Sequence, residues 1–211
     1  MIDTILFDCD GTLIDTEDAI IESFQLTLRD ELGLDEPAAA LDFILGIPGI
    51  AATRRYTDSE EAAHHLLEVW TNNTAAGFRQ TSLFPGIADL LDWLKSQGYR
   101  TAIVTSRLAH ELVDDIPRLS LDRWFDTFVT ASDTERHKPD AQPTELALQR
   151  LGASPGQSLF IGDSIYDQGS ANAAGVLFGL AGWGVRHASH FDQAALIAQT
   201  PADVAVFLQQ R

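Results

Sequence analysis

Two acidic side chains stand two residues apart near the start of the chain, directly after a short apolar run. The run covers residues 5–7, and the carboxylates belong to Asp8 and Asp10, with Gly11 next in the chain. Carboxylates this close repel each other, so the arrangement is costly unless a cation or hydrogen-bond donors compensate. Gly11 allows the backbone to turn tightly near a ligand. The pattern predicts a Mg²⁺-assisted phosphoryl-transfer site, and a solvated acidic turn is the alternative.

A second acidic pair follows another apolar run much later in the chain. Asp163 comes after residues 158–161, and Asp167 stands about one helical turn further on. The two carboxylates face the same side if a helix begins near Ser164. Mg²⁺ takes oxygen ligands and keeps several waters, so a few protein oxygens suffice to hold it. Capping of the helix by Asp163 or Ser164 is the alternative, and it does not exclude metal binding.

Two hydroxyl groups and a lysine complete the set of candidate polar residues. Thr105 and Ser106 follow apolar residues 103–104 and can present hydroxyl and backbone N–H groups to an anion, although simple helix capping is the alternative. Lys138 is one of two lysines in the chain and can supply a compact positive charge to a phosphate. A surface lysine is the ordinary alternative. The two acidic pairs, the hydroxyl pair and the lysine occur in order at strand ends or in nearby loops. Together they favour a phosphoryl-transfer site over the separate alternatives.

The elements that must position these residues alternate between strands and helices. Strands that alternate with helices imply a parallel sheet with right-handed crossovers. The predicted fold class is therefore α/β, with a Rossmann-like parallel sheet. The expected strands lie at residues 5–7, 99–104, 125–130, 158–161 and 175–179, and the expected helices at residues 87–97, 110–119, 143–151 and 171–174.

A long helical stretch interrupts this alternation after the first strand. Helical spacing extends over about residues 17–78, with a predicted loop at residues 46–49. The predicted domains are an α/β core at residues 1–14 and 85–211 and an all-helical insertion at residues 15–84. In open α/β sheets, ligands bind beyond the carboxyl ends of the strands, so the candidate residues are expected to converge there.

Composition limits the possible partners of the chain. Its 211 residues are 45% hydrophobic, and 14 basic against 31 acidic side chains give a net charge of −17. A duplex-binding protein needs a surplus of Lys and Arg, so nucleic acid is not an expected partner, nor is an anionic membrane surface. The single cysteine, Cys9, forms no internal disulfide and is expected to pack in the core. The absence of a signal-peptide pattern or long apolar run predicts a soluble cytoplasmic protein.

The motifs resemble those of the haloacid dehalogenase-like superfamily, in particular its phosphatases with a helical cap inserted after the first motif. Residues 8–13, Asp-Cys-Asp-Gly-Thr-Leu, resemble the first motif, and residues 162–167, Gly-Asp-Ser-Ile-Tyr-Asp, resemble the fourth. Thr105 matches the second motif and Lys138-Pro139 the third. The similarity extends from residue 2 to about residue 185 and is greatest to phosphoglycolate phosphatases and β-phosphoglucomutases. It implies that residues 15–84 form a cap domain.

The resemblance implies a catalytic role for four residues. Asp8 is expected to be the nucleophile that forms an aspartyl-phosphate, and Asp10 the general acid and then the general base. Thr105 and Lys138 are expected to bind the phosphoryl oxygens. The implied Mg²⁺ ligands are Asp8, Asp10 through its backbone carbonyl, Asp163, and Asp167 directly or through water.

The residues that choose the substrate are less well defined by the sequence. The substrate-binding candidates are Thr12, Ser106, Arg54 and Arg55. A carboxylate-bearing substrate such as phosphoglycolate would suit an arginine in the cap. A solvated helix face is the favoured interpretation for at least two of Arg54, Arg55 and Arg79.

The favoured function is a Mg²⁺-dependent phosphatase that hydrolyses a small-molecule phosphate ester, either phosphoglycolate-like or a sugar phosphate. The alternative is a β-phosphoglucomutase-like sugar-phosphate mutase. Dehalogenases of the superfamily lack the second aspartate, and its phosphonate hydrolases use a cap lysine that residues 15–84 do not contain. A non-catalytic binding module would be expected to lack at least one motif residue. The oligomeric state is not predicted.

Overall fold

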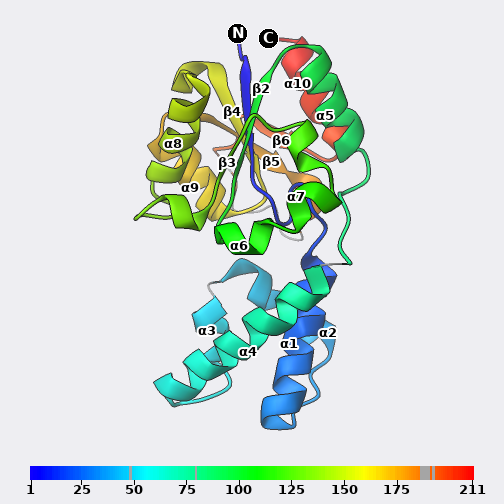
Figure 1. Cartoon of the computed structure of the whole chain (residues 1–211), viewed down its shortest axis with the longest axis vertical. Coiled ribbons are helices and arrows are strands. Elements are labelled where there is room, and N and C mark those ends of the chain that lie inside the picture. Colours follow the sequence, from blue (N-terminus) through cyan, green and yellow to red (C-terminus); the bar gives the residue numbers. More distant parts are fainter. Residues whose placement is uncertain (48, 79, 186–190, 192) are drawn as a thin grey trace. The chain divides into compact units, whose positions relative to one another are not determined.

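A computed structural model describes the chain except for residues 48, 79, 186–190 and 192. The chain divides into two compact units (Figure 1). The core unit comprises Met1–Asp15 and Ser82–Arg211, and the helical unit comprises Thr16–Thr81. No helix of the described ranges is long and apolar enough to cross a membrane.

A parallel sheet forms the centre of the core unit. Within the described residues it has six strands in the order β3-β2-β1-β4-β5-β6, and each neighbouring pair is parallel. Both β1 and β4 are buried along their whole length, which is why they read as continuous apolar runs. The predicted α/β fold class is confirmed. The strands are β1 (Thr4–Phe7), β2 (Arg100–Val104), β3 (Thr127–Val129), β4 (Ser158–Gly162), β5 (Leu177–Ala181) and β6 (Leu196–Ala198).

Helices cover both faces of this sheet (Figure 1). The helices α5 (Ile87–Ser96) and α10 (Pro201–Gln209) share one hydrophobic cluster with Ile5 and Phe7 of β1. The intervening Leu6 packs in the other cluster, which includes side chains of α8 (Gln142–Leu151) and α9 (Ile165–Ala173). This alternation is the two-residue period of a strand that is buried on both faces.

Three parts of the core unit differ from the sequence-based expectation. The helix expected at residues 110–119 is divided into α6 (Ala109–Leu112) and α7 (Asp115–Arg118). Pro117 has no N–H to donate and its ring clashes with the preceding turn, so one continuous helix cannot form. Neither β6 nor α10 was expected, although Thr200, Pro201 and Asp203 form an N-terminal capping signal for α10.

The helical unit has its own hydrophobic core. Its helices are α1 (Glu17–Leu32), α2 (Ala38–Leu41), α3 (Gly49–Thr53) and α4 (Glu60–Phe78), with a 3-10 turn at Asp42–Gly46. The ring centroids of Phe24 in α1 and Trp70 in α4 lie 4.5 Å apart, and the Trp70 Nε1–H donates to Ser23 Oγ at 3.0 Å. Of the loop expected at residues 46–49, Pro48 lies outside the described residues.

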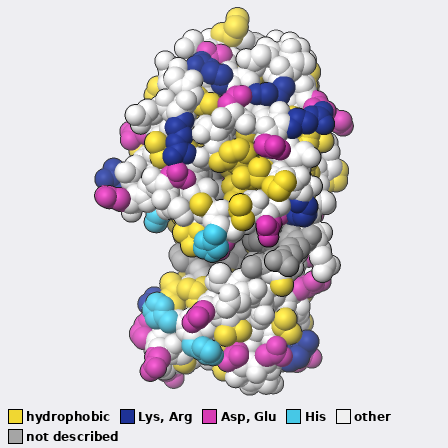
Figure 2. Space-filling model, in the orientation of Figure 1, with side chains coloured by type: hydrophobic (Ala, Val, Ile, Leu, Met, Phe, Trp, Pro, Cys, Tyr) yellow, Lys and Arg dark blue, Asp and Glu magenta, His cyan; other side chains and the backbone are white. Residues whose placement is uncertain are grey.

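The surface of the helical unit carries ion pairs that are open to solvent. Arg29 pairs with Asp35 at 2.9 Å and Arg54 with Glu60 at 2.8 Å, and all four side chains are more than half exposed. Figure 2 shows acidic and basic side chains interspersed over the visible face of the molecule. Such pairs favour solubility and contribute little to folding stability.

Candidate active site

The carboxyl ends of adjacent strands gather the predicted motif residues at one edge of the sheet. Asp8 follows β1, Thr105 follows β2 and Asp163 follows β4. Since β1 lies between β2 and β4 and all three are parallel, these residues emerge at the same edge. Lys138 reaches the edge from the loop before α8, and Asp167 lies in the first turn of α9. All of these residues belong to the core unit.

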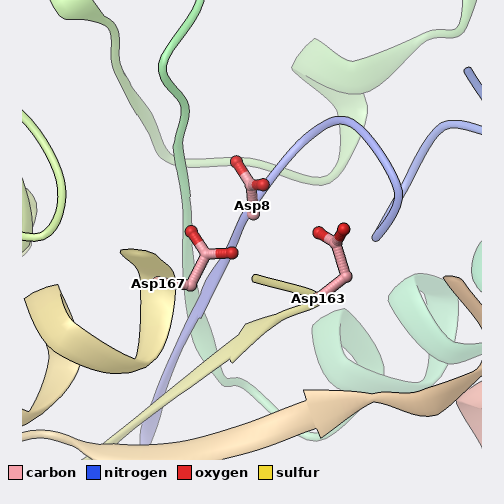
Figure 3. A group of neighbouring side chains, drawn as sticks. All are labelled: Asp8, Asp163 and Asp167. Atoms are coloured by element: carbon pink, nitrogen blue, oxygen red, sulfur yellow. The ribbon is translucent and has the colours of Figure 1, made fainter. Parts of the chain in front are cut away.

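Asp8, Asp163 and Asp167 form a compact acidic cluster (Figure 3). Each offers a carboxylate oxygen within 4.8 Å of those of the other two. Ser164 is the N-cap of α9, and its Oγ accepts a hydrogen bond from the Asp167 N–H at 3.2 Å. Asp167 Oδ2 accepts from the Ser164 N–H at 3.0 Å. The same turn therefore caps α9 and places Asp167 in the acidic cluster. Helix capping and metal binding are compatible interpretations of this motif.

Burial makes the negative charge of this cluster costly. It raises the pKa of Asp8 from 3.8 to about 7, and the Asp167 charge adds to the effect. Burial also raises the pKa of Asp163 well above its ordinary value, with the charges of Asp8 and Asp167 as further causes. A divalent cation among these oxygens would remove both penalties. Among the described residues the donor set consists of three carboxylates, which fits Mg²⁺.

Lys138 is the positive charge that this cluster already contains. Its side chain is 4% exposed, and its Nζ donates to Asp8 Oδ1 at 2.8 Å and to Asp167 Oδ1 at 2.6 Å. Burial alone would lower the pKa of Lys138, but the charges of Asp167 and Asp8 outweigh it and raise the pKa above its ordinary value. Lys138 is therefore charged at every physiological pH. One ammonium still leaves the three carboxylates with an excess of negative charge, which is what a metal site requires.

Asp10 lies apart from the acidic cluster and pairs with a residue that the sequence analysis did not single out. Arg107 Nε donates to Asp10 Oδ2 at 2.7 Å, and Arg107 Nη2 donates to Asp10 Oδ1. A lone arginine in a turn carries no pattern of its own. The signal that could have found Arg107 is its position directly after Thr105 and Ser106, the two residues of the predicted phosphate-binding turn.

The loop after β1 is held closely against the start of α9. Gly11 has a φ of 71°, and a Cβ there would lie 2.4 Å from Asp163 Oδ2, so only glycine fits. The Thr12 hydroxyl donates to Asp163 Oδ1 at 2.9 Å, and Thr12 is fully buried. The Thr12 side chain therefore orients a predicted metal ligand, and its substrate contact stays a prediction.

A turn after β5 also contacts this loop. Trp183 Nε1–H donates to the Thr12 carbonyl at 2.9 Å. A Cβ on Gly184 would lie 1.6 Å from the Gly11 carbonyl oxygen, so the two backbones are in direct contact. These contacts fix the loop that carries Asp8 and Asp10.

The remaining predicted residues fall into two groups. Thr105 is buried, and its Oγ1 accepts from the Arg107 N–H at 3.1 Å, which leaves its own hydroxyl hydrogen to donate. Ser106 is exposed.

The predicted arginines lie in the helical unit. Arg54 pairs there with Glu60, and the guanidinium of Arg55 lies 3.9 Å from the centroid of the Phe43 ring. Arg79 lies outside the described residues. Substrate binding by Arg54 and Arg55 stays a prediction.

Cys9 lies between the two aspartates of the first motif but takes no part in their contacts. The thiol is buried, and burial raises its pKa well above the ordinary value, with Asp10 as the next cause. The thiolate is therefore disfavoured, and Cys9 packs in the core as the sequence predicted.

The fold and the motif residues at its strand ends define a class of enzyme. The haloacid dehalogenase-like hydrolase family matches residues 5–181, and the chain belongs to that family. The predicted family, and with it the prediction that the chain is a hydrolytic enzyme, are confirmed.

The chain is similar to pyrophosphatases and to a phosphoglycolate phosphatase within this family. A protein of Caldanaerobacter subterraneus subsp. tengcongensis assigned as a pyrophosphatase PpaX is 34% identical over 185 residues, which are 87% of this chain and 83% of the relative. Pyrophosphatase PpaX of Halalkalibacterium halodurans is 30% identical, over 88% of this chain and 86% of its own. A solved structure from Lactobacillus plantarum, assigned as a phosphoglycolate phosphatase, is 30% identical with a TM-score of 0.86 and covers 98% of this chain and 99% of its own.

Proposed function

We propose that the protein is a Mg²⁺-dependent phosphatase that releases phosphate from a small phosphorylated molecule through an aspartyl-phosphate at Asp8. The observation that carries the proposal is the grouping of Asp8, Asp163 and Asp167 at the carboxyl edge of the sheet, where Lys138 binds Asp8 and Asp167. This grouping combines a nucleophilic carboxylate, a fixed cation and a set of oxygen ligands within one small volume. Phosphoryl transfer needs these groups, since its catalysis is mostly positioning and charge stabilisation.

Each residue has a distinct part in this reaction. Lys138 and Thr105 bind the oxygens of the phosphoryl group and direct its phosphorus toward Asp8. Asp8 attacks the phosphorus as the bond to the leaving oxygen breaks, and Asp10 gives a proton to that oxygen. Asp10 then takes a proton from the water that attacks the aspartyl-phosphate, which releases inorganic phosphate and restores Asp8. Bound Mg²⁺, held by the oxygens of Asp8, Asp10, Asp163 and Asp167, would neutralise the negative charge of the transferring group.

The names of the relatives suggest two substrates to test first. Inorganic pyrophosphate and phosphoglycolate are both small, and both bear a second anionic group beyond the phosphoryl group that is transferred. We propose that the helical unit, which is inserted directly after the first motif, acts as a cap and supplies contacts to that second group, with Arg54 and Arg55 as candidates. The relatives named above are hydrolases, which favours the phosphatase over the mutase.

A hydrolysis screen tests the proposal. The purified protein is given pyrophosphate, phosphoglycolate, sugar phosphates and an aryl phosphate, with Mg²⁺ or with a chelator, and free phosphate is measured. Phosphate release that needs Mg²⁺ and is greatest for one small anionic compound supports the proposal. Full activity after exhaustive chelation contradicts the metal site. Isomerisation of a sugar phosphate with little free phosphate shows a mutase instead.

A further inference from the structure

A row of four charged side chains leads from Asp10 through the buried side chains of Arg107 and Asp115 to Arg118. Arg107 holds Asp10 through Nε at 2.7 Å and through Nη2, and its Nη1 donates to Asp115 Oδ2 at 2.5 Å. The other oxygen of Asp115 accepts from Arg118 Nε at 3.0 Å. Asp115 begins α7, so the row joins the first-motif loop to α7.

The middle of this row is buried, whereas its active-site end is not. The side chains of Arg107 and Asp115 are each 5% exposed, and that of Asp10 is 27% exposed. A buried guanidinium is costly unless carboxylates compensate it fully. Burial by itself lowers the pKa of Arg107, but Asp10 and the other contacts outweigh it and raise the pKa above its ordinary value. Arg107 therefore keeps its positive charge, and its hydrogen bonds to Asp10 and Asp115 orient its guanidinium.

The backbone of Arg107 belongs to the predicted phosphate-binding turn. Its N–H donates to Thr105 Oγ1 at 3.1 Å, and its carbonyl accepts from the Ala131 N–H at 2.8 Å. One short turn thus carries both Thr105, the predicted phosphate-binding residue, and Arg107, whose side chain binds Asp10. The separation between the phosphate-binding group and the acid–base group is set by this turn.

We infer that Arg107 is a positioning residue that orients the carboxylate of Asp10 for its proton transfers, with Asp115 as the anchor of Arg107. The inference rests on the proposed phosphatase function. A planar guanidinium that binds both oxygens of a carboxylate fixes the direction of its plane, which a point charge such as a lysine ammonium does not do. Asp115 balances the charge of Arg107 from within the core unit, so Arg107 stays in place while Asp10 exchanges its proton.

A double-mutant cycle with Asp10 tests this inference. Arg107→Lys keeps the charge but loses the two-point contact, and a misplacement of about 1 Å can cost roughly 100-fold in rate. We expect kcat for an aryl phosphate to fall by roughly that factor with KM little changed. In the Asp10→Asn background, the same Arg107→Lys change should lower single-turnover phosphate release no further, because Asp10 is the residue through which Arg107 acts. Arg123→Lys, in an exposed pair with Asp92, is the matched control and should leave kcat unchanged.

A purely structural role for Arg107 predicts a different result. The loss caused by Arg107→Lys would then be the same with Asp10 or Asn at position 10, and this outcome overturns the inference. If Arg107→Lys does not fold, Asp115→Asn, which leaves the Asp10–Arg107 contact in place, goes through the same cycle, and its effect on kcat must likewise disappear in Asp10→Asn. Failure of the proposed function is separate, since the wild-type protein would then release no phosphate from any substrate.

Discussion

The core unit contains buried ion pairs beside exposed ones, whereas the described ion pairs of the helical unit all reach the solvent. In the core unit, Lys138, Arg107 and Asp167 are 5% exposed or less and each contacts at least one group of opposite charge. In the helical unit, the pairs of Arg29 and Arg54 are more than half exposed. Exposed pairs contribute roughly 0–1 kcal/mol to stability, whereas removing one partner of a buried pair costs roughly 3–5 kcal/mol.

We interpret the buried charges of the core unit as functional and the exposed pairs of the helical unit as groups that favour solubility. Apolar side chains of the same volume would often serve the fold as well as a buried ion pair or better, so buried charges at a strand edge indicate a function. The helical unit has no such buried charge among its described ion pairs, and its interior is a cluster that includes Phe24, Leu28 and Trp70. The reaction is therefore expected to depend on the core unit, and the helical unit is expected to affect which substrate reacts.

The largest effect is expected for Asp8→Asn, which removes the proposed nucleophile. Turnover should fall to background, because no aspartyl-phosphate can form. The fold should not suffer, since burial opposes the charge of Asp8 and Lys138 keeps its contact with Asp167. We therefore expect the Tm in chelator at pH 8 to equal or exceed that of the wild type. Phosphate release and thermal unfolding measure the two effects, and retained turnover would contradict the assignment of Asp8.

Lys138→Met should be the most destabilising change at the site. It leaves the buried carboxylates of Asp8 and Asp167 without their shared cation, which should cost about 3–5 kcal/mol of unfolding free energy. The control is Lys95→Met, the only other lysine in the chain, whose pair with Asp126 is about one-third exposed and should cost less than about 1 kcal/mol. Urea unfolding measures both. Equal costs at the two lysines would show that burial does not distinguish these pairs.

The stability of the metal-free protein should depend on pH through Asp8. The folded-state pKa of about 7 exceeds the ordinary value of 3.8, so the folded state holds this proton more tightly than the unfolded state. The resulting stabilisation is present at low pH and is lost as pH rises toward 7. Between pH 5 and pH 7 the loss should be roughly 2–3 kcal/mol.

Mg²⁺ should reverse this loss, because it neutralises the ionised cluster. Urea unfolding at pH 5 and pH 8, with Mg²⁺ or with a chelator, measures the effect, and Mg²⁺ should stabilise more at pH 8. Asp8→Asn is the control and should weaken the dependence on pH, while Asp163, whose pKa burial also raises, accounts for what is left. A metal-free protein that becomes more stable as pH rises over this range would contradict the role of Asp8.

Much of the site could be predicted because strand ends are visible in a sequence. An apolar run that stops at a polar residue marks both the strand and its carboxyl end, and this placed Asp8, Thr105 and Asp163 at one edge. Arg107 was missed because its partner Asp10 is 97 residues away and nothing in the sequence pairs them. The contact between Gly184 and Gly11 is also long-range. Its only sign in the sequence is that both residues are glycines.

The other differences have local causes. Pro117 divides the expected helix, since a proline inside a helical pattern removes a backbone donor. The strand β6 has only three residues and its Ile197 is half exposed, so it shows neither a continuous buried run nor a visible two-residue period. The contacts of Arg54 and Arg55 with a substrate, and the location of the protein in the cytoplasm, stay predictions.

The smallest effect on stability, and the sharpest test of the helical unit, is expected from Arg54→Gln. Its pair with Glu60 is exposed, so the unfolding free energy should change by less than about 1 kcal/mol. If Arg54 contacts the second anionic group of the substrate, KM for pyrophosphate or phosphoglycolate should rise several-fold, while an aryl phosphate without that group is hydrolysed as before. Arg29→Gln removes a similar exposed pair from the same unit and should change neither KM nor kcat. Equal KM values for the two variants on every substrate would show that Arg54 is a solvated surface residue, and substrate choice would then have to come from the core unit or from other residues of the helical unit.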